Sequence, residues 1–337
     1  MVCWYHLVRF SLYLYNLLSI YARHDPTIMI INGRAIADQL YDELKKRVAK
    51  LRQKGVIPHL VVLLIGENPA SVSYITQKKR HAELIDAKVT IMQFPEQVTT
   101  DELVKTIEKL NINKSVHAIL VQKPLPEQID VPTIDETISP NKDVDGFNSK
   151  STFVLALPLA VMKILEYIYS TNSLIANEVK QSILTDEIAA LSSVAHNDGK
   201  DQFISWLRSK TIVVLGKGPT AGGPTIVHME KLGLQPNVID SKTESSHEIM
   251  KQADILISAV GKEHAVTAHD LKKGVILIGV GLYRGADGKN HGDYDEEDIK
   301  DIAGFYTPTP RGVGPVNVAC LMENVVTAAE QQTPFSS

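Results

Sequence analysis

The chain has 337 residues, a length that allows two modest domains or one large domain. Its composition, with 44% hydrophobic and 22% charged residues, is that of an ordinary globular protein. The formal net charge of −4 leaves no basic field that would attract nucleic acid, so a nucleic-acid partner is excluded.

The first 28 residues are predicted to be an extension outside the folded core. Residues 10–21 (FSLYLYNLLSIY) are apolar, but a bilayer-spanning helix needs about 20 such residues. No small-residue cleavage site follows the run, as a secretory signal would require. Arg9 and Arg23, without early acidic residues, leave a transit peptide as the alternative. We expect no membrane partner and a folded protein that begins near Met29.

Residues 29–150 alternate between patterns typical of strands and of helices. Buried strands appear as continuous apolar runs, and helices as apolar residues at a spacing of three to four. The predicted strands are 29–32, 60–65, 89–94 and 118–121, and the predicted helices are 34–54, 70–85 and 100–111. Thr99 or Thr100 is the expected N-cap of the last helix. This alternation predicts an α/β domain with a mainly parallel sheet.

Residues 151–207 connect this domain to a second α/β unit. A helix is predicted at 158–168, and the polar stretch 169–207 is interpreted as an inserted helical segment in which Phe203 and Trp206 pack. The second unit, 208–314, has predicted strands at 211–215, 237–240, 254–259 and 275–280. The order of its strands, loops and helices predicts a Rossmann-like, doubly wound sheet.

A glycine-rich loop at 216–223 follows the first strand of the second unit and precedes a helix that runs to about Leu232. Such a loop lets backbone N–H groups approach a pyrophosphate at the start of a helix. Asp240 ends the next strand, where a ribose-binding carboxylate is expected. The spacing G-x-G-x-x-x-G differs from the usual fingerprint, so an ordinary tight turn stays open as an interpretation.

A second group of polar residues is Tyr74, Lys78, Gln122 and Asp145. Tyr74 and Lys78 stand four residues apart on a predicted helix and therefore share one face. Gln122 follows the predicted strand 118–121, at the sheet edge where ligands bind in α/β folds. A lysine beside an amide and shielded from water can handle protons. Taken singly, these residues also fit a solvated helix face and a loop.

Four segments of the chain carry motifs in a fixed order. They are SYITQKKR at 73–80, ILVQKPLP at 119–126, PNKDVDGF at 140–147 and TPTPRGVGP at 307–315. They resemble the Y-x-x-x-K, V-Q-L-P-L-P, P-x-K-D-V-D-G-F and T-P-V-P-G-G-V-G-P segments of the methylenetetrahydrofolate dehydrogenase/cyclohydrolase family, the FolD type. Lys123 stands where the family has leucine. The resemblance covers nearly all of 29–330 apart from the insertion.

The resemblance implies a bifunctional enzyme of one-carbon metabolism. The family oxidises 5,10-methylenetetrahydrofolate with a nicotinamide cofactor and hydrolyses the methenyl product to 10-formyltetrahydrofolate. By this resemblance Lys78 manages protons around the attacking water, and Gln122 holds and tunes that lysine. Tyr74 lies along the folate ring, and Asp145 hydrogen-bonds the polar edge of the pterin. Gly314 and Pro315 shape the wall between folate and cofactor.

The resemblance places the cofactor in the second unit. The expected cofactor-binding residues are Gly216, Lys217, Gly218, Gly222, Gly223, Asp240, Ser241, Gly281 and Asn317. The family loop reads G-R-S-x-x-V-G-x-P, so Lys217 and Gly218 replace an arginine and a serine that help to hold the extra phosphate of NADP. Asp240 suits the free ribose of NAD, whereas the stretch 241–243 (SKT) matches the family and favours NADP. We predict NADP, with NAD as the alternative.

Gly279 replaces an aspartate of the family, and Asn317 a threonine, so the departures gather on the cofactor side. Two alternatives follow: a monofunctional NAD-dependent dehydrogenase, or a cyclohydrolase or folate-binding protein with a degenerate cofactor site. The resemblance also implies a folate-binding domain at 29–150 that a C-terminal helix from 315–337 completes. It further implies a homodimer formed through the 208–314 domain.

Metal and disulfide chemistry are not predicted. The eleven histidines form no helical pair with acidic residues at ligand spacing. The two cysteines, Cys3 and Cys320, lack metal-binding neighbours and cannot form a disulfide framework. Their small number favours a reducing compartment, and we expect a cytoplasmic protein.

Overall fold

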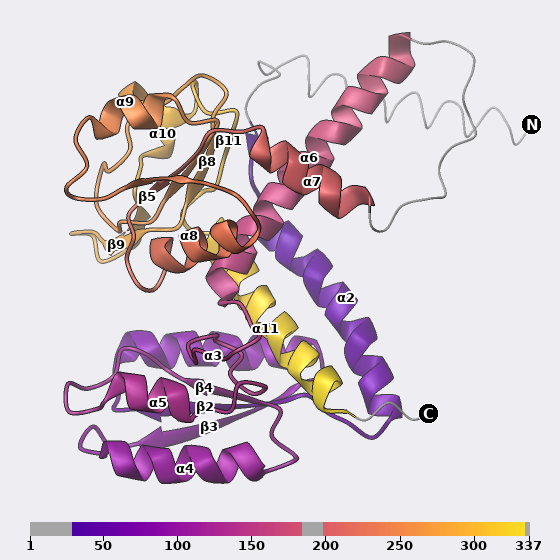
Figure 1. Ribbon diagram of the computed structural model, residues 1–337, viewed down its shortest axis with the longest axis vertical. Coiled ribbons are helices and arrows are strands. Elements are labelled where there is room, and N and C mark those ends of the chain that lie inside the picture. The colour runs from indigo at the N-terminus through magenta and orange to yellow at the C-terminus, as the bar shows by residue number, and fades with distance from the viewer. Residues whose placement is uncertain (1–28, 184–197, 334–337) are drawn as a thin grey trace, which may run out of the picture.

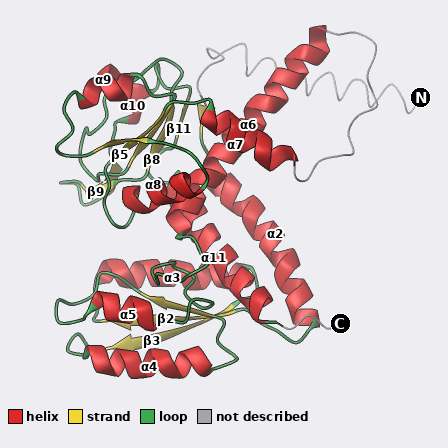
Figure 2. Cartoon of the chain, in the orientation of Figure 1, coloured by secondary structure: helices red, strands yellow, loops and turns green. Residues whose placement is uncertain are grey.

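The computed structural model describes residues 29–183 and 198–333, without the side chains of 69–74, 173–183 and 198 (Figure 1). The predicted extension 1–28 and part of the predicted insertion lie outside the described residues. Two groups of strands are separated in space by a layer of long helices (Figure 2). This arrangement confirms the predicted class of two α/β units.

The first sheet has three parallel strands in the order β3-β2-β4. Its elements are β2 (His59–Ile65), β3 (Lys88–Phe94), β4 (Ala118–Val121), α3 (Pro69–Leu84), α4 (Thr100–Ile112) and α5 (Val131–Thr137). Leu60, Val62 and Leu64 face a cluster with α2, α3 and α11. Val61 and Leu63 face α4 and α5 on the other side. Since successive side chains point to opposite faces, the continuous apolar run covers both.

The local signal at the start of α4 is confirmed. The Thr99 side chain accepts a hydrogen bond from the Glu102 N–H, and the Glu102 carboxylate accepts one from the Thr99 N–H. This capping box satisfies backbone donors that a helix N-terminus otherwise leaves unpaired.

The second sheet has six parallel strands in the order β1-β11-β8-β7-β5-β6. The strands are β1 (Met29–Ile30), β5 (Ile212–Leu215), β6 (Asn237–Ile239), β7 (Ile255–Ser258), β8 (Ile276–Gly279) and β11 (Phe305–Tyr306). The other elements are α8 (Gly222–Lys231), α9 (Ser246–Lys251), α10 (Glu296–Ile299), the 3₁₀ turn Ala268–Asp270, and a hairpin of β9 (Leu282–Arg284) and β10 (Asn290–Gly292). The Rossmann-like prediction is confirmed.

The position of β1 differs from the prediction, which assigned residues 29–32 to the first domain. Met29 and Ile30 pair with Phe305 and Tyr306 of β11, so they extend the second sheet. The Met29 N–H donates to the Gly304 carbonyl, and the Ile31 N–H donates to the Tyr306 carbonyl. A strand of two residues depends on such backbone pairing for its place, and hydrophobic periodicity does not reveal its partner.

Three helices lie between the sheets: α2 (Gly33–Gln53), α6 (Ala156–Ile183) and α11 (Val313–Gln332). In Figure 1, α11 runs beside α2 and α6. One apolar cluster continues from β2 through these helices to β5, β7 and β8. The two domains therefore share a core, and separating them would expose apolar surface to water.

The inserted segment begins as a continuation of α6. The predicted helix 158–168 and the following residues to Ile183 form a single helix, so the predicted boundary at 169 between the connecting helix and the inserted helical segment is absent. Helix α7 (Asp198–Arg208) packs back on α6, with Phe203 and Trp206 centred 5.7 and 5.4 Å from the Tyr169 ring. The predicted packing of these two aromatic residues is confirmed.

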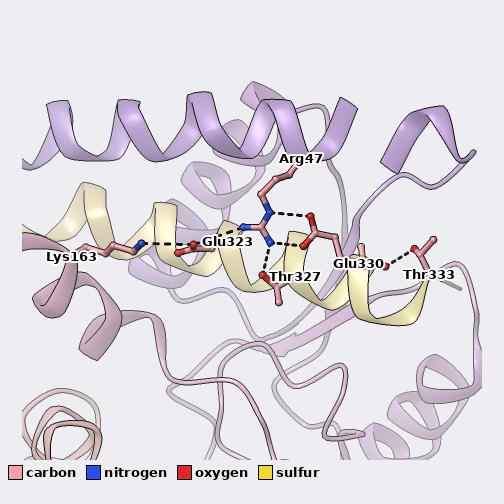
Figure 3. Close-up of polar contacts among 7 residues, drawn as sticks. Arg47, Lys163, Glu323, Thr327, Glu330 and Thr333 are labelled. Carbon is pink, nitrogen blue, oxygen red and sulfur yellow. Dashed lines mark hydrogen bonds and ion pairs between the residues drawn. The ribbon is translucent and has the colours of Figure 1, made fainter. Parts of the chain in front are cut away.

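A polar cluster ties the helix layer together (Figure 3). Arg47 of α2 forms two parallel hydrogen bonds to Glu330 of α11, at 3.0 and 2.6 Å, and donates a third to Thr327 at 2.7 Å. Glu323 lies 3.8 Å from Arg47 and 3.9 Å from Lys163 of α6. Paired geometry of this kind gives an arginine–carboxylate contact more strength and specificity than a single hydrogen bond.

Among the described residues, no helix combines the length and the apolar character needed to cross a membrane.

We expect Arg47→Ala to lower the free energy of unfolding by about 1–2 kcal/mol, because it removes three half-buried hydrogen bonds between α2 and α11. Chemical denaturation of the full chain measures this change. Lys45→Ala is the matched control: Lys45 pairs with Asp42 on the exposed side of α2, so its loss should cost less than about 0.5 kcal/mol. Equal effects of the two variants would show that the Arg47 cluster does not join the helices.

Candidate active site

A pocket of about 530 Å³ lies where the two domains meet. The residues that line it come from distant parts of the chain and include Asn68, Lys78, Gln122, Lys123, Asp145, Thr220, Asn317 and Leu321. Lys78 lies on α3, Gln122 directly follows β4, Thr220 belongs to the glycine-rich loop and Asn317 lies in the first turns of α11. The carboxyl ends of the parallel strands thus face the pocket, as is usual for ligand sites in α/β folds.

Lys78 and Gln122 are in direct contact, as the resemblance to the family implied. The Lys78 Nζ donates a hydrogen bond of 2.9 Å to the Gln122 Oε1. The Gln122 Nε2 donates to the Lys123 carbonyl at 2.7 Å, which fixes the orientation of the amide. Burial lowers the pKa of the Lys78 amine below its usual range, and the nearby Asp145 carboxylate opposes this effect. The amine therefore releases a proton more readily than an exposed lysine.

Asp145 lies in the same pocket, at a turn that its neighbours hold firmly. Burial raises the pKa of the Asp145 carboxyl, while Lys78 and Lys123 lower it. Beneath it, Asp143 is 1% exposed and accepts hydrogen bonds from the N–H groups of Gly146 and Asn148. Burial raises the pKa of Asp143 to about 6. This buried carboxyl group fixes the turn that presents Asp145.

Asn324 is a site-supporting residue that sequence reasoning missed. Its Nδ2 donates to the carbonyls of Val144 and Val154, both at 2.9 Å, so α11 holds the backbone next to Asp145. Asn324 is 6% exposed. The available signal was an amide in the apolar middle of α11, because a buried amide needs partners.

The predicted folate-side residues are not all brought together. Tyr74 lies one helical turn before Lys78 on α3, but its side chain lies outside the described part of the structure. Gly314 and Pro315 lie in the first turn of α11, whereas the pocket lining from that helix starts at Asn317. A side chain at 314 would have open space, so the conformation of this glycine is not sterically imposed.

The glycine-rich loop has the shape that a dinucleotide needs. Gly216 has a φ of +93° and donates its N–H to the Ile239 carbonyl at the end of β6. A Cβ on Gly222 would lie 1.9 Å from the Gly216 carbonyl oxygen, so only glycine allows this approach. Gly223 donates its N–H to the Gly218 carbonyl. Since no side chain caps the start of α8, its backbone N–H groups suit a pyrophosphate, and the loop fits a nicotinamide dinucleotide.

Lys217 and Asp240 form an ion pair at this loop. The Lys217 Nζ lies 2.6 Å from the Asp240 Oδ2, and the other carboxylate oxygen accepts hydrogen bonds from the Lys242 N–H and the Thr243 hydroxyl. The Lys217 ammonium, the Lys242 N–H and the Thr243 hydroxyl hold the pKa of Asp240 down to about 2. Ser241, the next residue, is exposed. Both oxygens of the predicted ribose ligand thus have partners within the protein.

Gly281 lies where the strands β7 and β8 end. A Cβ at this position would meet the Asp293 carboxylate at 2.1 Å. Asp293 is fully buried and accepts hydrogen bonds from the Ser258 hydroxyl and from the N–H groups of Val260 and Lys262. Gly281 therefore packs on a buried carboxylate that also binds the segment after β7.

The Tyr294 side chain explains why residue 279 is a glycine. A Cβ there would meet the Tyr294 ring at 2.8 Å, so Tyr294 fills the space that a larger residue at 279 would need. The Tyr294 hydroxyl donates to the Thr307 carbonyl at 2.5 Å. Within the described ranges, no group of three or more acidic, histidine or cysteine residues is arranged to hold a metal ion.

Comparison with known proteins identifies the family. Residues 31–145 match the family model for the tetrahydrofolate dehydrogenase/cyclohydrolase catalytic domain, and residues 201–333 match that for its NAD(P)-binding domain. The chain belongs to the tetrahydrofolate dehydrogenase/cyclohydrolase family. It is 35% identical to the bifunctional protein FolD of Enterococcus faecalis over 312 residues, which cover 90% of this chain and 99% of the relative.

Solved structures agree with this assignment. The bifunctional FolD enzyme of Campylobacter jejuni superposes with a TM-score of 0.76 at 31% identity, covering 91% of this chain and all of the other. The Trypanosoma brucei dehydrogenase-cyclohydrolase, solved with NADP and an inhibitor, has a TM-score of 0.73 at 26% identity over 90% of this chain and 98% of its own. The prediction of a bifunctional member of this family is confirmed over the monofunctional alternative.

We expect Gly222→Ala to weaken dinucleotide binding by more than about tenfold, because the added methyl group would displace the Gly216 carbonyl and open the loop. Titration of the full chain with NADP, followed by the change in protein fluorescence, measures the dissociation constant. In Gly199→Ala, on helix α7 away from the loop, the methyl group would also meet no atom within 4 Å, so a change of less than about threefold is expected. If both variants bind NADP like the unmodified chain, the loop does not hold the dinucleotide.

Proposed function

We propose that this chain oxidises 5,10-methylenetetrahydrofolate to the 5,10-methenyl form with NADP and hydrolyses that product to 10-formyltetrahydrofolate in one pocket. The observation that carries the proposal is the Lys78–Gln122 pair beside Asp145, in a pocket whose other wall contains Thr220 of the dinucleotide loop. The same pocket thus offers groups for proton transfer and a border with a cofactor site.

Lys78 is the residue that we assign to hydrolysis. Its amine lies inside the pocket, and burial favours the neutral form, which accepts a proton from an attacking water. Gln122 has no charge, so it orients the amine without stabilising the ammonium as a carboxylate would. Asp145 lies close enough to stabilise the Lys78 ammonium that forms once the amine has accepted a proton.

Asp145 and Tyr74 are the residues that we assign to folate binding. Asp145 presents a carboxylate to the pocket, and a carboxylate accepts hydrogen bonds from the N–H groups of a pterin. Tyr74 is one turn from Lys78 on α3, where an aromatic ring stacks on a flat heterocycle. Gly314 and Pro315 are assigned to the wall that follows, at the start of α11.

Oxidation needs orientation more than it needs an acid or a base. When bound, NADP supplies the nicotinamide that accepts the hydride. The loop residues Gly216, Gly218, Gly222 and Gly223 are assigned to the pyrophosphate, and Asn317 to the cofactor side of the pocket. Gly281, which packs on the Asp293 carboxylate, is assigned to the cofactor-binding side of the second domain outside the pocket lining. The shared core of the two domains keeps the folate residues in a fixed relation to this loop, which favours transfer between two held reactants.

NADP is the cofactor that we propose, with NAD as the alternative. Asp240 would repel a 2′-phosphate, but Lys217 neutralises it at 2.6 Å. Lys217 and Lys242 together outnumber this one carboxylate, and Ser241 adds an exposed hydroxyl. A trypanosomal member of the family has been solved with NADP, which agrees with this choice.

We also propose a homodimer that forms through the second sheet. Strand β6 lies at its edge, and Val238 of β6 and Val227 of α8 are 37% and 50% exposed. An unpaired sheet edge beside exposed apolar side chains is a common basis for association between copies. A cytoplasmic location is proposed as well, because the buried Cys320 remains a free thiol.

The direct test follows the absorbance of methenyltetrahydrofolate with the purified full chain. Methylenetetrahydrofolate is supplied with NADP or with NAD, and methenyltetrahydrofolate is supplied separately. We expect product formation with NADP, followed by methenyl decay faster than in buffer. Decay without any oxidation would reduce the proposal to a cyclohydrolase. If neither reaction occurs, the chain is a folate-binding protein or has another role.

We expect Lys78→Met to slow methenyl hydrolysis by about 100-fold or more, because no side chain remains to accept the proton. Oxidation should persist, since it depends on orientation. The measurement is methenyl decay at saturating substrate. Lys79→Met is the matched control, because the neighbouring Lys79 is exposed on the same helix and should retain the full rate. Hydrolysis at the unmodified rate in Lys78→Met would remove Lys78 from the mechanism.

We expect Asp240→Ala to increase the preference for NADP over NAD by about fivefold, the scale of one exposed charge pair. The substitution frees the Lys217 ammonium for a 2′-phosphate and removes an acceptor for the ribose diol. The ratio of kcat/KM values for the two cofactors measures it. Glu244→Ala, which removes an exposed acid nearby, should leave the ratio unchanged. An unchanged ratio in both variants would mean that Asp240 does not face the ribose.

A further inference from the structure

Lys123 is a charged residue in the pocket wall that the proposed mechanism leaves without a role. It follows Gln122 at the carboxyl end of β4, at the position where the family motif has leucine. It lines the pocket, and its side chain is 24% exposed. A half-buried cation requires compensation, since removing charge from water is costly.

Two partners compensate the Lys123 ammonium. Its Nζ lies 2.7 Å from the Oδ2 of Asp135 on α5, whose side chain is 15% exposed. It also lies 3.4 Å from the centroid of the Phe147 ring, the distance of a close cation–π contact. One ammonium therefore joins three separate segments: the end of β4, the helix α5 and the turn that contains Phe147.

These segments carry the residues that face the substrate. Phe147 is two residues after Asp145, so a fixed ring at 147 restricts the turn that presents the carboxylate. The Lys123 carbonyl accepts the hydrogen bond from the Gln122 amide, and that amide in turn receives the bond from Lys78. A shift of Lys123 would thus change both the turn that contains Asp145 and the hydrogen bonds of Gln122 with Lys78.

Lys123 also contributes to the charge balance around Asp145. The charged or titratable groups that face Asp145 are Lys78 on α3, Lys123 after β4, Asp135 on α5 and Asp143 on its own turn. The two lysines favour the carboxylate, whereas burial and Asp135 oppose it. Lys123 and Asp135 therefore act on Asp145 in opposite directions although they form one ion pair.

We propose that Lys123 is a positioning residue for the folate pocket: held between Asp135 and the Phe147 ring, it fixes the Asp145 turn and supplies positive charge beside Asp145. The inference rests on the proposed function only for the identity of the substrate. Loss of either partner of a purely structural ion pair would lower stability by a similar amount and would leave the KM for the folate unchanged, since both substitutions remove the same contact. If Lys123 supplies charge beside Asp145, substitution of Lys123 and substitution of Asp135 should shift the protonation of Asp145 in opposite directions.

The test uses the full chain and three variants, Lys123→Leu, Lys123→Arg and Asp135→Asn. In the proposed function Asp145 binds the folate as a carboxylate, so we expect the acid limb of the kcat/KM profile for methylenetetrahydrofolate to follow its protonation. Lys123→Leu should move this limb to higher pH, because the lost cation favoured the carboxylate. Asp135→Asn should move it to lower pH, because a repelling charge is gone. Lys123→Arg, which keeps the cation, should leave it near its original position.

Binding separates positioning from chemistry. Lys123→Leu should raise the KM for methylenetetrahydrofolate by about tenfold, the scale of one lost charge-assisted contact, and change kcat by less than about threefold. Lys123→Arg should recover most of this loss. Thermal unfolding of each variant shows whether the fold remains intact. Shifts of the acid limb in the same direction for Lys123→Leu and Asp135→Asn, or no shift in either, would overturn the inference.

A readout without turnover keeps the inference distinct from the proposed function. The carboxyl ¹³C resonance of Asp145, followed through a pH titration, should show the same opposite shifts in Lys123→Leu and Asp135→Asn. If the unmodified chain has no activity on folates, the proposed function fails while this titration still decides the role of Lys123. If the chain is active and the Asp145 titration is unchanged in both variants, the inference fails alone.

Discussion

The burial of one lysine amine is the constraint on which the site depends. Lys78 lies in a pocket wall and donates to an amide, so its charge is poorly compensated and its pKa falls. Such an arrangement lasts only if Gln122 cannot turn away, and the Lys123 carbonyl prevents this. It also needs a carboxylate that is near without forming a direct pair, and the turn around Asp145 provides one. A free lysine on a flexible loop would remain protonated and solvated.

The helix layer turns these local contacts into a two-sided pocket. Because α11 packs on α2 and α6, its first turns reach the pocket while Asn324, further along, holds the backbone next to Asp145. The continuous apolar core joins the helices to both sheets. The packing of this core therefore sets the distance between the folate-side residues and the dinucleotide loop.

The sequence predicted the fold class and most strands, because hydrophobic periodicity is a local signal. The grouping of Lys78, Gln122 and Asp145 was predicted from the resemblance to the family, since each residue alone also fits a solvated helix face or a loop. It did not predict that Met29 and Ile30 pair with β11, since two residues have no period. It divided α6 near residue 169, because a helix that leaves the core loses its apolar pattern. The contacts of Asn324 and Lys217 were missed because they join residues distant in sequence. The contacts of Asp143 are local, but they depend on the conformation of the turn, which hydrophobic periodicity does not report. For Tyr74 the assignment still rests on its position in the helix.

The path of the chain has a consequence for its synthesis. The strand β1 belongs to the second sheet, the next helix lies in the shared layer, and α11 returns to the first domain at the end. Neither domain is therefore a continuous stretch of polypeptide. As the ribosome releases the chain from its N-terminus, β2 emerges long before α11, the C-terminal helix that packs in the same apolar cluster. The part of this face that α11 covers therefore stays exposed in the nascent first domain until α11 has been made, and chaperones that bind apolar segments can bind there during that period.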